Sequence, residues 1–261
     1  MSDRNSTLRI TFLGTGTSNG IPVIGCTCRV CQSPDPRDRR TRTSAVVEAD
    51  GKTLLIDTSP ELREQALANR LAWIDAVLYT HAHADHVDGF DDLRRFNELR
   101  QSALDVHVDA HTAHLLHQRF GYAFENPFPF YGGKPDLNIK VFDGPFEAAG
   151  IPVVPFQVGH GRWIVNGFRI GGLVYLTDAK VIPPESLEVM RDADVLVINA
   201  LRLRPHPVHL SLSEALDVIA EVQPRRAYLV HLSHELSHED ATALLPPGVA
   251  VAYDGLTVEL T

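Results

Sequence analysis

The sequence lacks two features that would each point to a class of protein. No apolar run is long enough to span a membrane, and the first residues, MSDRNSTLRITFLG, contain no apolar signal-peptide core. There is also no basic excess, because 24 lysines and arginines against 33 aspartates and glutamates give a net charge of -9, which argues against a broad nucleic-acid footprint. We therefore expect a soluble, cytoplasmic protein that does not act on membranes and has no broad nucleic-acid surface. A local basic patch around Arg37, Arg39, Arg40 and Arg42 stays open.

Cysteine is scarce and confined to one place. The chain has 3 cysteines among 261 residues, and all three lie in the segment Cys26-Thr27-Cys28-Arg29-Val30-Cys31. An odd number at CxCxxC spacing suits metal binding better than a disulfide framework. A structural zinc wants a fourth ligand, and His234 late in the chain is the candidate. The alternative is a trio of free, buried cysteines.

Histidine, in contrast, is concentrated at one point. The segment from Thr80 to His86, THAHADH, holds four potential metal ligands, follows an apolar run from Ile74 to Tyr79, and precedes a helix-like segment from Asp88 to Leu99. The apolar run predicts a buried strand, because it is short and rich in branched and aromatic residues. A polar surface turn is the alternative interpretation of the segment that follows it.

The spacing of these ligands predicts two metal ions. If the chain stays extended, His81, His83 and Asp85 share one face, because strand side chains alternate, and His86 turns out of that register. We expect His81 and His83 to hold one ion, and Asp85 and His86 to hold a second. Imidazole and carboxylate suit zinc, manganese or iron.

Three further candidate ligands directly follow predicted strands. They are His160 after the strand Ile151–Val158, Asp178 after the second of two paired strands within Phe168–Leu176, and His231 after the strand Ala227–Val230. The first ion still needs a third nitrogen, which His160 would supply. In general, a carboxylate can bridge two ions held about 3.5 to 4 Å apart, as a two-metal hydrolytic site requires. His231 completes the second ion. Taken alone, His160 would be a surface histidine and Asp178 a turn residue or helix cap.

Two features near the N-terminal end border the expected site. The loop Gly14–Gly20 follows a predicted strand, Leu8–Leu13, and we interpret it as a tight turn rather than a phosphate cradle, because it has no P-loop lysine. Asp57 ends the second strand of a hairpin that turns at Asp50-Gly51. It is either a turn or helix-capping aspartate or a support for the metal motif, and we do not count it as a ligand.

The remaining segments predict strands and helices. The expected elements are strands at 46–49, 52–56, 195–200 and 249–256, a strand and then a helix over 105–120, and helices over 60–69 and 213–221. The helix over 105–120 carries His111, His114 and His117, which we assign to a solvated face. The segment Phe124–Pro135, within the region 121–136, predicts a loop and is our candidate for substrate contact.

The motif HxHxDH after a buried strand resembles the metal-binding signature of the metallo-β-lactamase superfamily. The resemblance implies an α/β (α+β) fold, the αββα sandwich, in which two facing mixed β-sheets have helices outside. It implies a single domain over residues 1–261, with the strand ends that carry the ligands gathered along one edge. It also implies that His160 is the third nitrogen ligand of the first ion and that Asp178 is the bridging carboxylate. Asp57, by the same resemblance, supports the metal motif from outside the ligand shell.

The cysteine cluster makes the resemblance narrower. GCTCRVC, LIDTSPEL, HAHADH, GHG, LTDA, HLSLSEAL and HLSH occur in the order of the PhnP-type phosphodiesterases of phosphonate breakdown. That resemblance implies two divalent ions, Zn²⁺ or Mn²⁺, a third, structural zinc, a small cyclic or nucleotide-like phosphodiester as substrate, and a homodimer. It implies catalytic roles for His209, which would act at the phosphate, and Asp85. His206 is the rival of His209.

Other functions use the same residues. A lactonase or thioesterase would act on a carbon acyl centre with the same metals, and a metal-binding sensor would keep the fold without turnover. Ribonuclease Z shares much of the motif set, but the chain has no long basic arm. The CxCxxC cluster is also similar to that of a protein of pyrroloquinoline quinone biosynthesis with the same overall fold.

Overall fold

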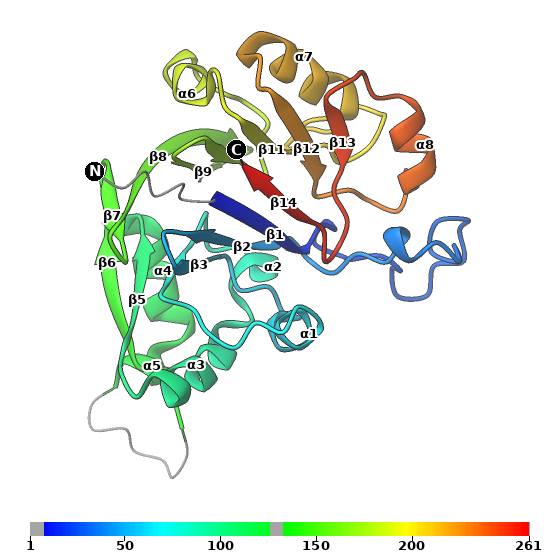
Figure 1. The fold of residues 1–261 in the computed structure, drawn as a ribbon. Coiled ribbons are helices and arrows are strands. Elements are labelled where there is room, and N and C mark those ends of the chain that lie inside the picture. Colours follow the sequence, from blue (N-terminus) through cyan, green and yellow to red (C-terminus); the bar gives the residue numbers. More distant parts are fainter. Residues whose placement is uncertain (1–7, 126–132, 261) are drawn as a thin grey trace.

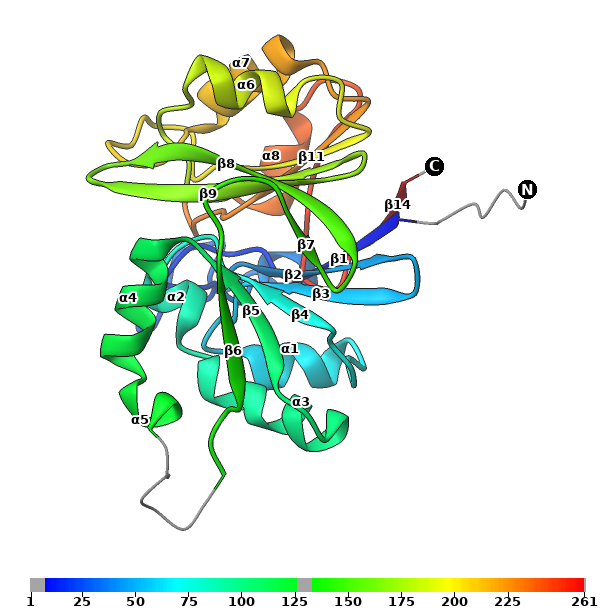
Figure 2. The same ribbon diagram turned by 90° about the vertical axis from the view of Figure 1, so that its left-hand side faces the viewer.

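The computed structural model describes residues 8–125 and 133–260, and in it two β-sheets face each other with helices on both outer sides (Figures 1 and 2). Helices α1 to α5 cover the outer face of one sheet, and α6 to α8 cover the other. The predicted α/β sandwich of two mixed sheets is confirmed.

The first sheet contains seven strands within the described residues, in the order β14-β1-β2-β3-β4-β5-β6. Their bounds are β1 (Leu8–Gly14), β2 (Ser44–Ala49), β3 (Lys52–Ile56), β4 (Ala76–Leu78), β5 (Leu104–Val108), β6 (Leu137–Val141) and β14 (Thr257–Leu260). The strands from β3 to β6 run parallel, so β3 and β4 end at the same edge of the sheet.

The second sheet also contains seven strands in the described part of the chain, in the order β13-β12-β11-β10-β9-β8-β7. Their bounds are β7 (Phe146–Ala148), β8 (Ile151–His160), β9 (Trp163–Ile170), β10 (Leu173–Tyr175), β11 (Val195–Asn199), β12 (Arg226–Val230) and β13 (Val249–Val251). Strands β10 to β13 are parallel, and β8 and β9 form an antiparallel hairpin.

The helices connect successive strands. The α-helices are α1 (Leu62–Ala68), α2 (Ala84–Val87), α3 (Leu93–Arg100), α4 (Ala110–Arg119), α5 (Gly121–Phe124), α6 (Pro184–Met190), α7 (Leu212–Val222) and α8 (His238–Ala243), and the 3-10 helices are η1 (Pro36–Asp38) and η2 (Phe90–Asp92). No helix among the described residues is both long and apolar enough to cross a membrane.

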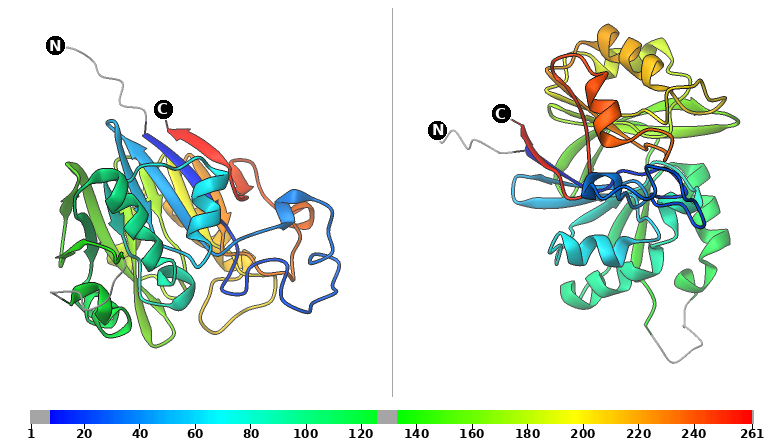
Figure 3. Two further views of the ribbon diagram at one scale, coloured as in Figure 1. Left: turned by 90° about the horizontal axis from the view of Figure 1, so that it is seen from below. Right: turned by 90° about the vertical axis from the view of Figure 1, so that its right-hand side faces the viewer.

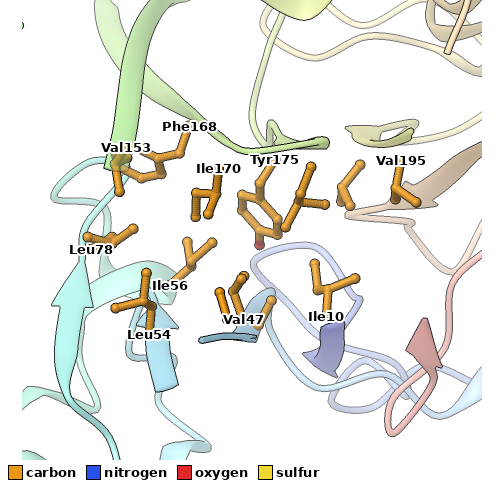
Figure 4. Packing of buried hydrophobic residues seen from close by; sticks show 14 of the residues in the cluster. Ile10, Val47, Leu54, Ile56, Leu78, Val153, Phe168, Ile170, Tyr175 and Val195 are labelled. Carbon is orange, nitrogen blue, oxygen red and sulfur yellow. The ribbon is translucent and has the colours of Figure 1, made fainter. Parts of the chain in front are cut away.

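The main core lies between the sheets and consists of side chains that alternate along the strands. Figure 4 shows side chains from the two sheets pointing toward one another, with Ile10, Val47, Leu54, Ile56 and Leu78 on one side and Val153, Phe168, Ile170, Tyr175 and Val195 on the other. All ten are at most 1% exposed. Burying one such side chain contributes about 1.5 to 3 kcal/mol, so this layer fixes the spacing of the sheets and of the strand ends above it.

The long connection between β1 and β2 leaves the sheet and reaches the opposite side of the sandwich. It lies beside α8 (Figures 1 and 3), where Arg29 forms an ion pair with Asp240 and the His238 amide donates to Asp38. This connection carries the three cysteines, so it joins the start of the chain to its last third.

Most of the strands and helices predicted from periodicity are present, with shifted ends. The hairpin around Asp50-Gly51 is confirmed, and both residues have positive φ, as a tight two-residue turn needs. The extended continuation beyond Tyr79 is wrong, because α2 begins at Ala84. The predicted strand at 249–256 is also wrong in part, because β13 ends at Val251 and β14 begins at Thr257 in the other sheet.

Candidate metal centre

One carboxylate, Asp178, stands at the centre of the site. It follows β10, is 2% exposed, and faces five histidines. Its Oδ1 is near His231 Nδ1 (3.3 Å) and His86 Nε2 (3.4 Å), whereas its Oδ2 is near His160 Nε2 (3.7 Å), His81 Nε2 (3.9 Å) and His209 Nδ1 (4.0 Å). The two oxygens therefore face two different sets of nitrogens, which is the arrangement of a carboxylate that bridges two ions.

The candidate ligands form three overlapping groups, each with its ligand atoms within 4.8 Å of one another. The groups are Asp85, His86, Asp178 and His231; His81, His83 and Asp178; and His160, Asp178 and His209. The structure thus brings together all seven side chains that the sequence pattern assigns to two ions. Metal binding by these residues stays a prediction.

The histidine motif reaches this geometry through a short helix. His83 precedes α2 with extended backbone (φ -68°, ψ 152°), and α2 then presents Asp85 and His86 toward Asp178. His81 and His83 stay on the chain that leaves β4, with ring centroids 4.5 Å apart. The change from strand end to helix, rather than strand alternation, separates the two ligand sets.

Asp57 lies behind the motif, and its carboxylate accepts three hydrogen bonds. The donors are His86 Nδ1 to Oδ2, the Thr80 amide to Oδ1, and Thr80 Oγ1 to Oδ2, all at 2.8 Å. Thr80 Oγ1 in turn accepts from His81 Nδ1 at 2.9 Å. Asp57 therefore orients one histidine of each ligand set, directly or through Thr80, and it is a support rather than a ligand.

Other backbone and hydroxyl groups hold His160 and His231. His160 Nδ1 donates to the carbonyl of Val208 at 2.7 Å, and His231 Nε2 lies 3.1 Å from Thr17 Oγ1. The glycine-rich loop that contains Thr17 thus borders the site, as its sequence predicts. His160 thus has one ring nitrogen occupied and the other facing Asp178, whereas the His231 Nδ1 that faces Asp178 also lies 3.1 Å from Thr43 Oγ1.

Two buried ring nitrogens lack the partner that a metal ion would provide. His81 Nε2 and His86 Nε2 are inaccessible to solvent and have no hydrogen-bond partner in the described structure, although buried polar atoms are nearly always paired. Burial would lower the pKa of His86, but the carboxylates of Asp85, Asp178 and Asp57 raise it well above the ordinary value. Orphaned imidazole nitrogens against carboxylates fit divalent ions such as zinc.

Three residues of the site adopt the left-handed backbone region that non-glycine residues seldom occupy. They are Asp57 (φ 59°), Asp178 (φ 56°) and His231 (φ 60°). Asp57 and His231 directly follow β3 and β12, and Asp178 comes shortly after the end of β10. Such conformations persist where the surrounding structure enforces them, and they cluster at functional sites. For Asp178, Asn199 provides part of that enforcement, because its side chain bonds both the amide and the carbonyl of Ala179 (2.7 and 3.1 Å).

His209 lies between the two ligand sets, on the loop before α7. Its ring centroid is 4.5 Å from that of His160 and 4.9 Å from that of His231, and its buried Nδ1 has no hydrogen-bond partner among the described residues. Burial, together with His231, lowers the pKa of His209 to about 3, so its ring is neutral near pH 7. His206 is farther out, with its ring 5.1 Å from that of His209.

The three cysteines and His234 form a separate group. His234 Nδ1 lies 3.3 Å from the sulfur of Cys26 and 3.5 Å from the sulfurs of Cys28 and Cys31. The Cys31 amide donates to Cys28 Sγ, which lowers the pKa of the Cys28 thiol to about 6. Four donors converging from two distant segments match a structural zinc site.

The structure describes the three histidines that we assigned to a solvated face, but only part of the predicted substrate loop. His111, His114 and His117 are exposed on α4 and outside the ligand groups, as predicted. The candidate substrate loop 124–135 is only partly described: Phe124 ends helix α5, and 126–132 lie outside the described residues. Sequence reasoning missed Thr80, Thr17 and Asn199, whose only local signal is a polar residue at a strand end.

Replacing Asp57 by asparagine is expected to weaken metal binding by about 10- to 100-fold, the usual cost of losing such a supporting group. Asparagine tolerates a positive φ, but its amide nitrogen cannot accept from Thr80 or His86. The affinity would be measured by competition with a chelator. Asp50→Asn, at an exposed left-handed position in the hairpin turn, is the matched control; unchanged affinity in Asp57→Asn would contradict the assignment.

The chain matches one family model and is similar to two curated proteins and to a solved structure. Residues 52–232 match the model of the Beta-lactamase superfamily domain. The chain is 41% identical over 95% of its length to "Octanoyltransferase" of Porphyromonas gingivalis, and 30% identical over 97% of its length to "Coenzyme PQQ synthesis protein B" of Xanthomonas euvesicatoria, which it covers fully. The chain spans only 51% of the length of the Porphyromonas protein.

A solved structure described as a new diphosphatase from the PhnP family is similar over the whole fold. It superposes with a TM-score of 0.90 at 38% sequence identity, covering 97% of both chains. Because the Porphyromonas protein is about twice as long, its name describes a molecule of which this chain resembles one half.

Proposed function

This chain belongs to the β-lactamase superfamily as a PhnP-like member with a metal-dependent hydrolase fold, and we propose that it hydrolyses a small phosphoester. The substrate class we propose is a phosphodiester, cyclic or nucleotide-like, including the diphosphate linkage named for the similar PhnP-family structure. The net charge of -9 supports a small molecule rather than a nucleic acid as the partner.

The observation that carries this proposal is the two-sided environment of Asp178. Its Oδ1 faces His86 and His231 at 3.4 and 3.3 Å, and its Oδ2 faces His81 and His160 at 3.9 and 3.7 Å. Two such sites that share one carboxylate support a dinuclear centre with Zn²⁺ or Mn²⁺, and the cysteine group supports a third, structural Zn²⁺. When bound, paired divalent ions supply an activated water and neutralise charge on a phosphoryl group.

The chain's own residues keep this centre in place and complete its chemistry. Asp57 and Thr80 hold the proton on Nδ1 of His86 and His81, so Nε2 is the nitrogen of each ring that is left to face a metal ion. Val208 does the same for His160 through its carbonyl oxygen. These tied nitrogens prevent the rings from turning, which fixes the geometry before the substrate arrives.

His209 acts on the substrate in this proposal. Its Nδ1 points into the space beside Asp178 and has no other partner in the described structure. From that position its neutral ring donates an N–H hydrogen bond that steadies the negative charge on the phosphoryl group.

His209→Ala is expected to lower kcat by about 100-fold or more, the usual contribution of a hydrogen-bond donor aimed at developing negative charge, while the metal content stays unchanged. Rates and bound metal would be measured on the same samples. His206→Ala serves as the control on the same loop and is expected to retain most activity. An undiminished rate in His209→Ala would make it a surface-loop residue, and lost metal would make it a ligand.

Acyl hydrolysis is the second candidate, favoured by the 41% identity to a protein named for transfer of an acyl group. The same metals can polarise a carbonyl oxygen. A sensor without turnover is the third, and full metal loading without hydrolysis of any substrate would identify it.

The test compares one metal-loaded preparation on three substrates: bis(p-nitrophenyl) phosphate, a dinucleoside diphosphate, and p-nitrophenyl acetate. We expect faster cleavage of at least one of the two phosphorus substrates. His81→Ala should lose that activity, whereas background hydrolysis by trace enzymes would survive the substitution. Cleavage of the acyl ester alone would shift the function to acyl hydrolysis.

A further inference from the structure

Trp163 adjoins the metal centre from the opening of β9. Its ring meets the ring of the candidate ligand His83 edge-on, with centroids 4.6 Å apart and planes at 68°. The exposed imidazole of His111 on α4 lies 5.5 Å from the same indole. Trp163 is only partly buried, and its strand neighbour Ile164 is 54% exposed, so this aromatic group is not part of the core.

A hollow of about 520 Å³ lies beside Trp163, within the range of small-ligand sites. It is lined by Asp109, His111, Gln157, Arg162, Trp163 and Ile164. Its lining therefore combines a flat aromatic surface with a cation and with polar groups that can recognise the edge of a ring.

The charges around this hollow favour an anionic ligand. Arg162, exposed at the tip of the β8–β9 hairpin, forms no ion pair or hydrogen bond with any residue in 8–125 or 133–260. The opposing carboxylate, Asp109, is already engaged by the Thr112 amide, Thr112 Oγ1 and Asn166 Nδ2 at 2.9, 2.9 and 2.6 Å. Within the described residues, the Arg162 guanidinium is therefore left open to a ligand.

A second hollow, of about 410 Å³, also adjoins Trp163 and lies along α4. It is lined by apolar side chains such as Val87 and Leu116, and its cation, Arg119, is paired with Asp88 at 2.7 Å. Among the described residues, the lining of this second hollow contains no unpaired cation. The two hollows therefore differ, and the one beside Arg162 is the better site for a charged aromatic ligand.

We propose that Trp163 and Arg162 form a nucleoside subsite, in which a heteroaromatic base stacks on the indole while Arg162 attracts the phosphate-bearing end. This inference rests on the proposed phosphoesterase function and narrows its substrate class to nucleotides. Stacking suits any base, because every base has a π-face, and arginine adds attraction to both ring and phosphate.

The test uses the fact that the chain has two tryptophans, Trp73 and Trp163. In a metal-loaded Trp73→Phe variant, Trp163 is the only indole. Adenosine 5′-monophosphate is expected to quench its fluorescence and to bind about tenfold more tightly than ribose 5-phosphate, which has the phosphate but no base. Equal affinities for the two compounds, or no quenching, would overturn the inference.

Two substitutions assign the effect to its residues, with affinities measured by calorimetry. Trp163→Leu should reduce adenosine monophosphate to the affinity of ribose 5-phosphate, and a surviving advantage would overturn the stacking role. Arg162→Gln should weaken both phosphates several-fold, whereas Arg63→Gln, an equal charge change at an exposed position on α1, should not. If Trp163→Leu does not fold, the comparison of adenosine monophosphate with ribose 5-phosphate in Trp73→Phe still shows whether the base stacks on Trp163.

The outcomes separate this inference from the function on which it rests. Trp163-dependent binding of the nucleotide without hydrolysis of any phosphoester would remove only the proposed function. Hydrolysis of bis(p-nitrophenyl) phosphate without any advantage for the base would remove only the nucleoside subsite.

Discussion

Asp178→Ala is expected to abolish hydrolysis, with a loss of at least about 1000-fold in kcat, and to release at least one of the two active-site ions. The reason is that Asp178 is the one carboxylate shared by all three ligand groups of the active site. Without it, the nitrogens of His86 and His231 on one side and of His81 and His160 on the other lose their common partner. Metal-assisted catalysis contributes several kcal/mol, which corresponds to a loss of this size.

The measurement pairs rates with metal content in the variant and its control. Asp217→Ala removes an exposed carboxylate on α7 and should leave both unchanged. A stability measurement is needed, because Asp178 is fully buried and its pKa, despite that burial, is held well below the ordinary value by His231 and His86. A folded Asp178→Ala protein with normal activity would refute the two-metal assignment.

Cys28→Ser is expected to remove one ion of three, to lower Tm by about 10 °C, and to leave the other two ions bound. A structural zinc contributes directly to folding free energy, and a loss of about 3 kcal/mol produces a shift of this order in a chain of this size. The cysteine group joins the β1–β2 connection to the segment after β12, because His234 lies three residues beyond His231.

Loss of this zinc should also loosen the loop that carries His209. Glu235, next to His234, forms ion pairs with Arg202 at 2.8 Å and Arg204 at 2.6 Å, and both arginines lie on that loop. Thr27→Ser, between the first two cysteines and exposed, is the control and should keep all three ions. Equal metal content in Cys28→Ser and the parent would contradict the structural zinc.

The sequence predicted the fold well where a residue's role is visible in its neighbours. A buried strand followed by HAHADH, and single histidines or aspartates after other apolar runs, were enough to gather the ligands. Parallel strands end at one edge, so side chains such as Asp57 and Thr80 meet there although 23 positions separate them along the chain.

What the sequence left out depends on contacts that no local pattern records. Strand alternation predicted an extended HAHADH, whereas the chain turns into helix α2 at Ala84. The prediction failed because α2 has only 4 residues, too few for a helical periodicity to be visible in the sequence. The contact between Trp163 and His83 joins the two halves of the sandwich, so only the fold reveals it. The segment 249–256 was interpreted as one strand, but a turn at Gly255 (φ 88°) separates β13 from β14.

The most direct test of the dinuclear centre is a titration of metal-free protein with Zn²⁺ or Mn²⁺ in which bound ions per chain and the rate of phosphodiester hydrolysis are measured together. We predict three ions at saturation, one of them lost selectively in Cys28→Ser, with activity that appears only when both ions of the Asp178 centre are bound. Full activity with a single ion at that centre, or no ion bound there at saturation, would contradict the account.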